Sequence, residues 1–85
     1  MYKIEIHKEA NKFLNSLTSE FNSHILKRLE ELKTIPYPQG VIRVKGYQEP
    51  IFRIRIGKYR VLYFVDNKTL TVYIIKIDKR GNVYE

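Results

Sequence analysis

The chain has 85 residues, with 16 lysine and arginine against 9 aspartate and glutamate side chains, and 44% of its residues are hydrophobic. This length predicts one domain over residues 1–85, and the hydrophobic content argues against disorder. With no cysteine and only two histidines, the chain offers neither a disulfide framework nor a convincing zinc site. We expect a small domain without metal or cofactor, and its net charge of +7 favours a polyanionic partner.

The first half of the sequence predicts a strand followed by two helices. Residues 2–6 alternate apolar and polar side chains, as a half-buried strand does. From Lys8 the period becomes that of an amphipathic helix, and Thr18 is a suitable N-cap for a second helix. Residues 35–40 contain two prolines and a glycine, which end that helix. The predicted apolar faces are Ala10, Phe13, Leu14 and Leu17 in the first helix and Phe21, Ile25, Leu26, Leu29 and Leu32 in the second.

The second half predicts antiparallel strands joined by short loops. Residues 41–45 form a short strand, and residues 51–56 and 59–65 form a hairpin around the two-residue loop 57–58. After a turn, residues 69–77 form a last long strand. The prediction is an α+β domain, in which an antiparallel meander sheet also takes the N-terminal strand and a two-helix hairpin packs on one face.

The positive charge is concentrated in the second half. Residues 1–40 carry six basic and five acidic side chains, whereas residues 41–85 carry ten basic and four acidic ones. A polyanion-binding surface is therefore expected in the second half, and the alternative is a solvated basic face without a ligand. No targeting signal and no apolar run of about 18 residues is present, so we expect a cytoplasmic protein that does not enter the membrane.

The two-residue loop determines which side chains of the hairpin share a face. It pairs Arg55 with Arg60 and places Arg53 on the same face. Like charges directly opposite each other destabilise a sheet, whereas guanidinium groups bind phosphate through paired hydrogen bonds. The cluster therefore favours phosphate recognition, and the alternative is that the arginines extend into water. Either register of the next hairpin adds Thr71, Tyr73 and Ile75 to this face, and the opposite, apolar face carries Phe52, Ile54, Ile56, Tyr59, Val61, Tyr63 and Val65.

Two segments resemble motifs of the RelE/ParE toxin superfamily. Residues 52–63, FRIRIGKYRVLY, are similar to its central motif yRiRvGdYRviY, and residues 77–84, IDKRGNVY, are similar to its closing motif hR..vY. The order of the predicted elements, including a strand that leads to Lys45 and Gly46, also agrees with the family. The similarity covers essentially the whole chain and is strongest to compact archaeal RelE members.

The resemblance implies a RelE-like toxin of a type II toxin–antitoxin system. Such a toxin is an mRNA interferase, an endoribonuclease that cleaves mRNA in the ribosomal A site without metal and is neutralised by a RelB-like antitoxin. It implies that Arg53 and Arg55 hold and activate the scissile phosphate and that Arg60 stabilises the transition state. It also implies that Arg80 lies near the leaving group and that Tyr84 stacks on or orients an mRNA base.

The groups that would transfer protons stay open at this stage. His7 and His24 are predicted to be surface residues, arginine is not deprotonated in proteins, and Lys79 stands where many relatives have histidine. Tyr84, Lys58, a ribosomal group or water are the alternatives. Beside the catalytic set, the residues expected to bind RNA are Arg43, Lys45, Lys58 and Lys79.

Two other functions remain as alternatives to RNA cleavage. One is a ParE-like toxin that inhibits DNA gyrase, and the other is a non-catalytic basic module that binds nucleic acid. The pair of Arg80 and Tyr84 at the end of the chain favours the RelE type.

Overall fold

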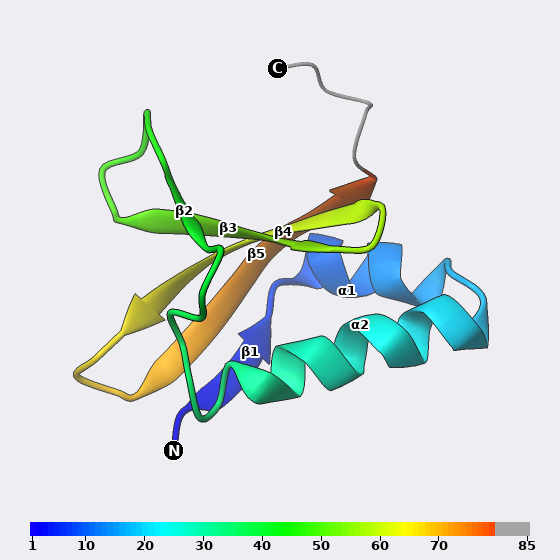
Figure 1. Cartoon of the computed structure of the whole chain (residues 1–85), viewed down its shortest axis with the longest axis horizontal. Helices are drawn as coiled ribbons and strands as arrows, with labels where there is room; N and C mark the ends of the chain where they lie inside the picture. Colours follow the sequence, from blue (N-terminus) through cyan, green and yellow to red (C-terminus); the bar gives the residue numbers. More distant parts are fainter. Residues whose placement is uncertain (80–85) are drawn as a thin grey trace.

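The computed structural model describes residues 1–79 of the chain (Figure 1). Its elements in chain order are β1 (Lys3–Ile6), α1 (Lys8–Asn15), α2 (Ser19–Glu31), β2 (Ile42–Val44), β3 (Ile51–Ile56), β4 (Tyr59–Asp66) and β5 (Thr71–Lys79). The strands form one sheet in the order β1-β5-β4-β3-β2, and both helices lie on one face of it. This confirms the predicted α+β fold, and it adds that β1 joins the sheet parallel to β5.

The two helices begin and end close to the predicted positions. The Thr18 hydroxyl accepts a hydrogen bond from the Phe21 backbone N–H at 3.5 Å, as expected of an N-cap. The apolar stripe predicted for α2 is not fully buried against the sheet. Phe21 and Leu26, at its margins, remain 39% and 40% exposed. No helix in the described part of the chain is long and apolar enough to cross a membrane.

The β3–β4 hairpin has the predicted register. Arg55 lies opposite Arg60 and Ile56 opposite Tyr59, with two loop residues between the strands. Gly57 begins the loop with a φ of 62°, a conformation that glycine adopts more easily than other residues. The face assignments made from the sequence for this hairpin are therefore confirmed.

Strand β5 departs from the prediction. It spans Thr71–Lys79 instead of residues 69–77, and its register against β4 shifts by one residue between Leu62 and Tyr63. Tyr63 pairs with Ile74 but Leu62 pairs with Lys76, so Ile75 lies between the two registers. Alternation along β5 is therefore interrupted by an irregularity of the β-bulge type.

The face of the sheet that carries Arg53, Arg55 and Arg60 is called the arginine face below. The register shift changes which side chains of β5 lie on it. Tyr73 lies on this face as predicted, since it is opposite Phe64 and the two rings stack at 4.9 Å. If the side chains of β5 alternated between the two faces without interruption, Ile77 would also lie on the arginine face. Its side chain is instead buried on the helix side. Lys76 and Asp78 take the arginine face instead, opposite Leu62 and Arg60.

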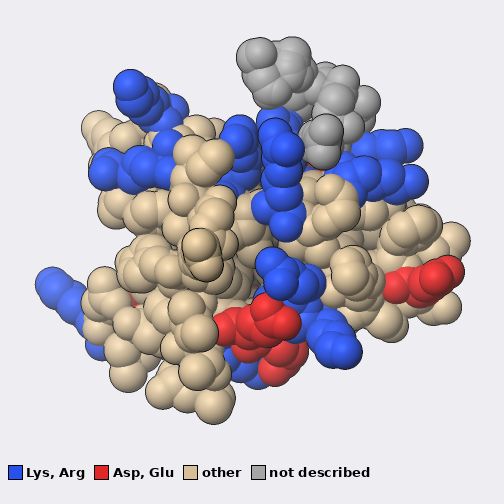
Figure 2. Space-filling view, in the orientation of Figure 1, with Lys and Arg blue, Asp and Glu red and all other residues tan. Residues whose placement is uncertain are grey.

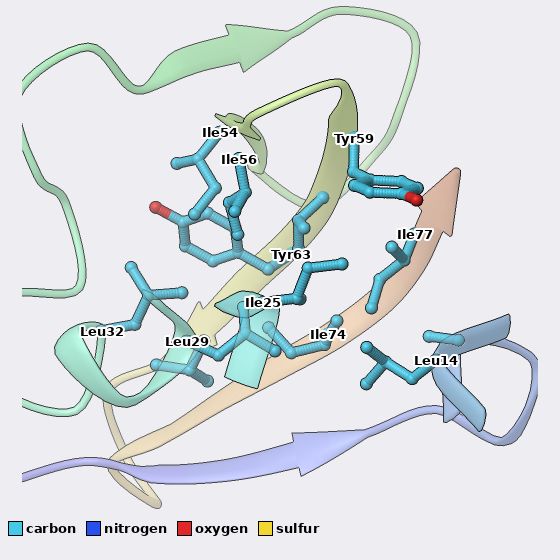
Figure 3. Packing of buried hydrophobic residues seen from close by; sticks show 13 residues of the cluster. Leu14, Ile25, Leu29, Leu32, Ile54, Ile56, Tyr59, Tyr63, Ile74 and Ile77 are labelled. Carbon is cyan, nitrogen blue, oxygen red and sulfur yellow. The ribbon is translucent and has the colours of Figure 1, made fainter. Parts of the chain in front are cut away.

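The core lies between the helices and the sheet (Figure 3). Tyr63 is fully buried there, and its hydroxyl donates a hydrogen bond to the Pro36 carbonyl at 2.7 Å. Burial raises the pKa of the Tyr63 hydroxyl well above its ordinary value, because the phenolate would lose its hydration. This bond attaches the connection after α2 to the centre of the sheet. The buried residues that form the core are Ala10, Leu14, Ile25, Leu29, Leu32, Ile54, Ile56, Tyr59, Val61, Tyr63, Val72, Ile74 and Ile77.

Candidate functional site

The three arginines singled out in the sequence lie together on the sheet face opposite the helices. On β3, Arg53 is opposite Leu62, and Arg55 is opposite Arg60 of β4. Arg55 is exposed, Arg53 is half-buried, and the side chain of Arg60 is only 12% exposed. The Arg60 side chain is therefore largely shielded from water, so solvent weakens its interactions less than those of the exposed Arg55.

Arg60 is held by an acidic residue that the sequence analysis did not identify. Its Nε donates to Asp78 Oδ1 at 3.2 Å and its Nη2 donates to Asp78 Oδ2 at 3.3 Å. The Asp78 side chain is 22% exposed, and Lys76 Nζ approaches Asp78 Oδ2 to 3.8 Å. This two-point contact orients the guanidinium group against the sheet. Asp78 could not be assigned to this face beforehand, because the register shift at Ile75 is what turns it there.

A cavity of about 320 Å³ opens at this ion pair, and we call it the Arg60 cavity. It combines three basic groups with a hydroxyl and a carboxylate, so it offers anion binding and groups that can carry protons. The contribution of Tyr47 comes from the loop after β2, and its ring is 48% exposed. The residues that line the cavity are Val44, Tyr47, Arg53, Arg60, Leu62, Lys76 and Asp78.

A second cavity, of about 430 Å³, lies on the other side of Arg53, and we call it the Arg28 cavity. Arg28 comes from α2, and Arg53 and Arg55 come from β3. Arg53 lines both this cavity and the Arg60 cavity. The residues of the Arg28 cavity are Arg28, Pro38, Gln39, Gly40, Ile42, Arg53, Ile54 and Arg55.

The other basic residues expected to bind RNA line neither of the two cavities. Arg43 is opposite Phe52, which places it on the other face of the sheet from Arg53. Lys79 is likewise opposite Tyr59, on the side of the helices. Lys58 in the hairpin loop extends over the Phe21 ring, with Nζ 4.9 Å from its centroid. Lys45 is exposed directly after β2, and it does not line either cavity.

Within the described residues, the two histidines line neither of the two cavities. His7 is the N-cap of α1 and His24 lies within α2, both exposed as predicted. Arg80 and Tyr84 lie outside the described residues. Within residues 1–79, no group of three or more histidine, cysteine, aspartate or glutamate side chains could hold a metal ion.

The distribution of charge over the surface agrees with the position of the two cavities. Figure 2 shows many lysine and arginine side chains in a band across the upper part of the molecule, and the visible acidic side chains lie below this band. In the same orientation, the upper part contains β2, β3 and the β3–β4 hairpin loop. The basic band therefore follows the strands that carry the arginines.

Comparison with known proteins identifies the family. The family model for the ParE toxin of type II toxin–antitoxin systems matches residues 4–84. The chain belongs to the RelE/ParE superfamily of type II toxins. The toxin is 36% identical to RelE1 of Methanocaldococcus jannaschii, a relative whose name describes it as a toxin, over 99% of this chain and 96% of that protein.

Solved structures have the same fold as this toxin. A chain of the archaeal RelE–RelB complex from Pyrococcus horikoshii is 32% identical to it and superimposes with a TM-score of 0.82, covering 96% of this toxin and 98% of that chain. The isolated RelE toxin of E. coli is 21% identical and superimposes with a TM-score of 0.80, covering 98% of this toxin and 88% of that chain. The toxin is thus of the RelE type, as the sequence motifs predicted.

Proposed function

We propose that this toxin is a ribosome-dependent endoribonuclease that cleaves mRNA in the A site and so inhibits translation. The observation that carries the proposal is the placement of Arg53, Arg55 and Arg60 on one sheet face, with Arg60 beside a cavity. Family membership supports the toxin role, and the arginine face supports RNA as the substrate.

The chemistry follows from what arginine can and cannot do. When the RNA 2′-hydroxyl attacks the adjacent phosphate, negative charge develops on a pentavalent phosphorane. Fixed guanidinium groups stabilise that charge, and they do so best where water is excluded. Arg60 meets this condition, because its side chain is only 12% exposed and is oriented by Asp78. In this proposal, Arg53 and Arg55 hold the phosphate from the neighbouring strand.

Proton transfer requires other groups. Arginine stays protonated, and neither His7 nor His24 lines a cavity on the arginine face. In the Arg60 cavity, the side chains able to carry a proton are Tyr47, Lys76 and Asp78. We propose that the toxin on its own cleaves RNA slowly and that the ribosome completes the site.

A RelB-like antitoxin is the proposed protein partner, and the cytoplasm the proposed location. The similar archaeal and E. coli structures include complexes of RelE with its antitoxin. The net charge of +7 suits an acidic segment that folds along the basic band. By covering the arginine face, such a segment would exclude RNA.

The test is an mRNA cleavage assay on translating ribosomes. The variant is Arg55→Ala, because Arg55 is exposed and its loss leaves the core intact. We expect cleavage to fall about 10²-fold, the effect of removing one group that stabilises a developing oxyanion. The control is Lys68→Ala, at an exposed position in the turn between β4 and β5. Arg80→Ala serves as a second variant, with its role taken from the family motif.

Two results would contradict the proposal. If Arg55→Ala and Arg80→Ala fold normally and cleave at the wild-type rate, the site is assigned wrongly. If induction of the wild-type toxin leaves mRNA intact and triggers a DNA-damage response, the toxin inhibits DNA gyrase. That second candidate rests on one observation, the match to the family model described for ParE toxins.

A further inference from the structure

All the charged side chains that line the Arg28 cavity are basic. Three arginines line it, and none of its lining residues is acidic. The Arg60 cavity, by comparison, contains Asp78. A hollow that gathers guanidinium groups without an acid favours an anionic ligand, because the anion relieves their mutual repulsion.

The arginines of this cavity have little to hold them elsewhere. Within residues 1–79, the side chains of Arg53 and Arg55 take part in no hydrogen bond or ion pair. Arg28 pairs with Glu31 at 3.1 Å, but the two side chains are 42% and 60% exposed. Exposed pairs of this kind contribute about 0–1 kcal/mol, so an incoming phosphate can replace the carboxylate of Glu31.

The sheet leaves room for a ligand at this position. Strand β2 pairs with β3 only from Ile51 to Arg53. On this edge, the described chain adds no strand beside Ile54 and Arg55, and the cavity lies there. Gln39 and Gly40 of the connection after α2 also line the cavity, and this connection is attached to the sheet at Pro36 by the hydrogen bond from Tyr63.

Arg53 connects this cavity to the Arg60 cavity, since it lines both. Two anion sites that share one arginine suit a ligand with phosphates at regular spacing along one strand. We propose that the Arg28 cavity binds a second phosphate of the same RNA strand, next to the phosphate in the Arg60 cavity. Arg28 is then an RNA-binding residue contributed by a helix. The inference rests on the proposed function and extends its substrate from one phosphate to at least two.

The experiment measures binding of RNA to Arg28→Ala by fluorescence anisotropy. The probes are 2′-deoxy-substituted oligonucleotides, which cannot be cleaved, with either one or three phosphates. For the longer probe we expect about tenfold weaker binding and a smaller dependence of log K on log salt, by roughly 0.7, which corresponds to one lost phosphate contact on a single strand. For the probe with one phosphate we expect no difference from wild type.

The matched control is Lys27→Ala, an exposed neighbour on α2 that lines neither cavity. It removes the same charge, and it should weaken binding less than twofold. The double variant Arg28→Ala/Arg55→Ala should lose less affinity than the sum of the single variants, because both side chains line the Arg28 cavity. Thermal unfolding of each variant checks that the fold is intact.

Several outcomes would overturn the inference. These are unchanged binding of the longer probe by Arg28→Ala, an equal loss for Lys27→Ala, or a loss that is the same for both probes. If Arg28→Ala weakens only the binding of an acidic antitoxin peptide, the cavity serves that protein instead. A wild-type toxin that binds the probes but does not cleave mRNA on ribosomes would contradict the proposed function alone.

Discussion

Replacing Asp78 with asparagine is expected to make the toxin less stable and, at the same time, a tighter binder of RNA. The asparagine side chain has nearly the same size, but it lacks the negative charge and one of the two acceptors that Arg60 uses. In the absence of RNA, the carboxylate stabilises the fold by pairing with a shielded guanidinium group. We expect a bound phosphate to take the place of this carboxylate, so the same interaction opposes binding.

The expected loss of stability follows from the exposure of the Arg60–Asp78 ion pair. Its side chains are 12% and 22% exposed, which places it between a surface ion pair and a fully buried one. Hydrogen bonds to charged groups contribute about 1.5–3 kcal/mol and exposed ion pairs about 0–1 kcal/mol, so we expect a loss of about 1–2 kcal/mol. For a domain of this size, that lowers the melting temperature by roughly 4–16 °C. The same free energy, no longer opposing RNA, corresponds to about five- to thirtyfold tighter binding.

The assay pairs two measurements on each variant. Urea unfolding gives the free energy of unfolding, and anisotropy with a non-cleavable RNA gives the dissociation constant. The control is Glu5→Gln, which removes an exposed acid on the edge strand β1 and changes the net charge equally. Its RNA binding should change less than twofold at physiological salt, where distant surface charges are screened.

The two results for Asp78→Asn must move in opposite directions. If stability falls but RNA affinity is unchanged, phosphate does not compete with Asp78 for Arg60. If affinity falls as well, Asp78 is needed to hold Arg60 in its binding position. An equal gain in affinity for Glu5→Gln would show that only the overall charge matters.

Three further predictions concern the fold and are measured by chemical unfolding. Tyr63→Phe leaves the Pro36 carbonyl without its hydrogen bond and should destabilise the toxin by about 1 kcal/mol. Because burial raises the pKa of Tyr63, the native state holds the hydroxyl proton more tightly than the unfolded state does. The free energy of unfolding of the wild type should therefore decline above about pH 10, by up to ~1.4 kcal/mol per pH unit. Tyr63→Phe should lack this contribution to the pH dependence. Ile25→Ala, at a site 0% exposed, should remove about 2–5 kcal/mol. Gly57→Ala should remove about 1–2 kcal/mol through its φ of 62° alone, since a Cβ there meets no atom within 4 Å, and an unchanged stability would contradict this.

The β3–β4 hairpin was predictable because its register depends on local chemistry. A two-residue loop beginning with glycine leaves one way to pair the strands, and that pairing placed Arg55 opposite Arg60. The apolar periods of α1 and α2 were equally local signals. Exposure of Phe21 and Leu26 was not predictable, because it depends on how much of the sheet each helix covers.

The remainder of the site depends on contacts between distant parts of the chain. Asp78 and Lys76 reach the arginine face only because the register shifts near Ile75, and a bulge has no reliable signature in an apolar strand. Arg28 lies on a helix, where its position off the apolar stripe indicated only that it is not in the core. Only the fold shows that it lines one cavity with Arg53 and Arg55 of β3.

The irregularity at Ile75 divides β5 into two parts that make different contacts. The part before it, Thr71 to Ile74, holds β1 in the sheet, and the pairing with β1 ends there. The part after it supplies Lys76 and Asp78 to the Arg60 cavity. Substitution of Lys76 or Asp78 therefore alters no residue that pairs with β1. The residues of β5 that surround Arg60 and those that attach the N-terminal strand can thus be substituted separately.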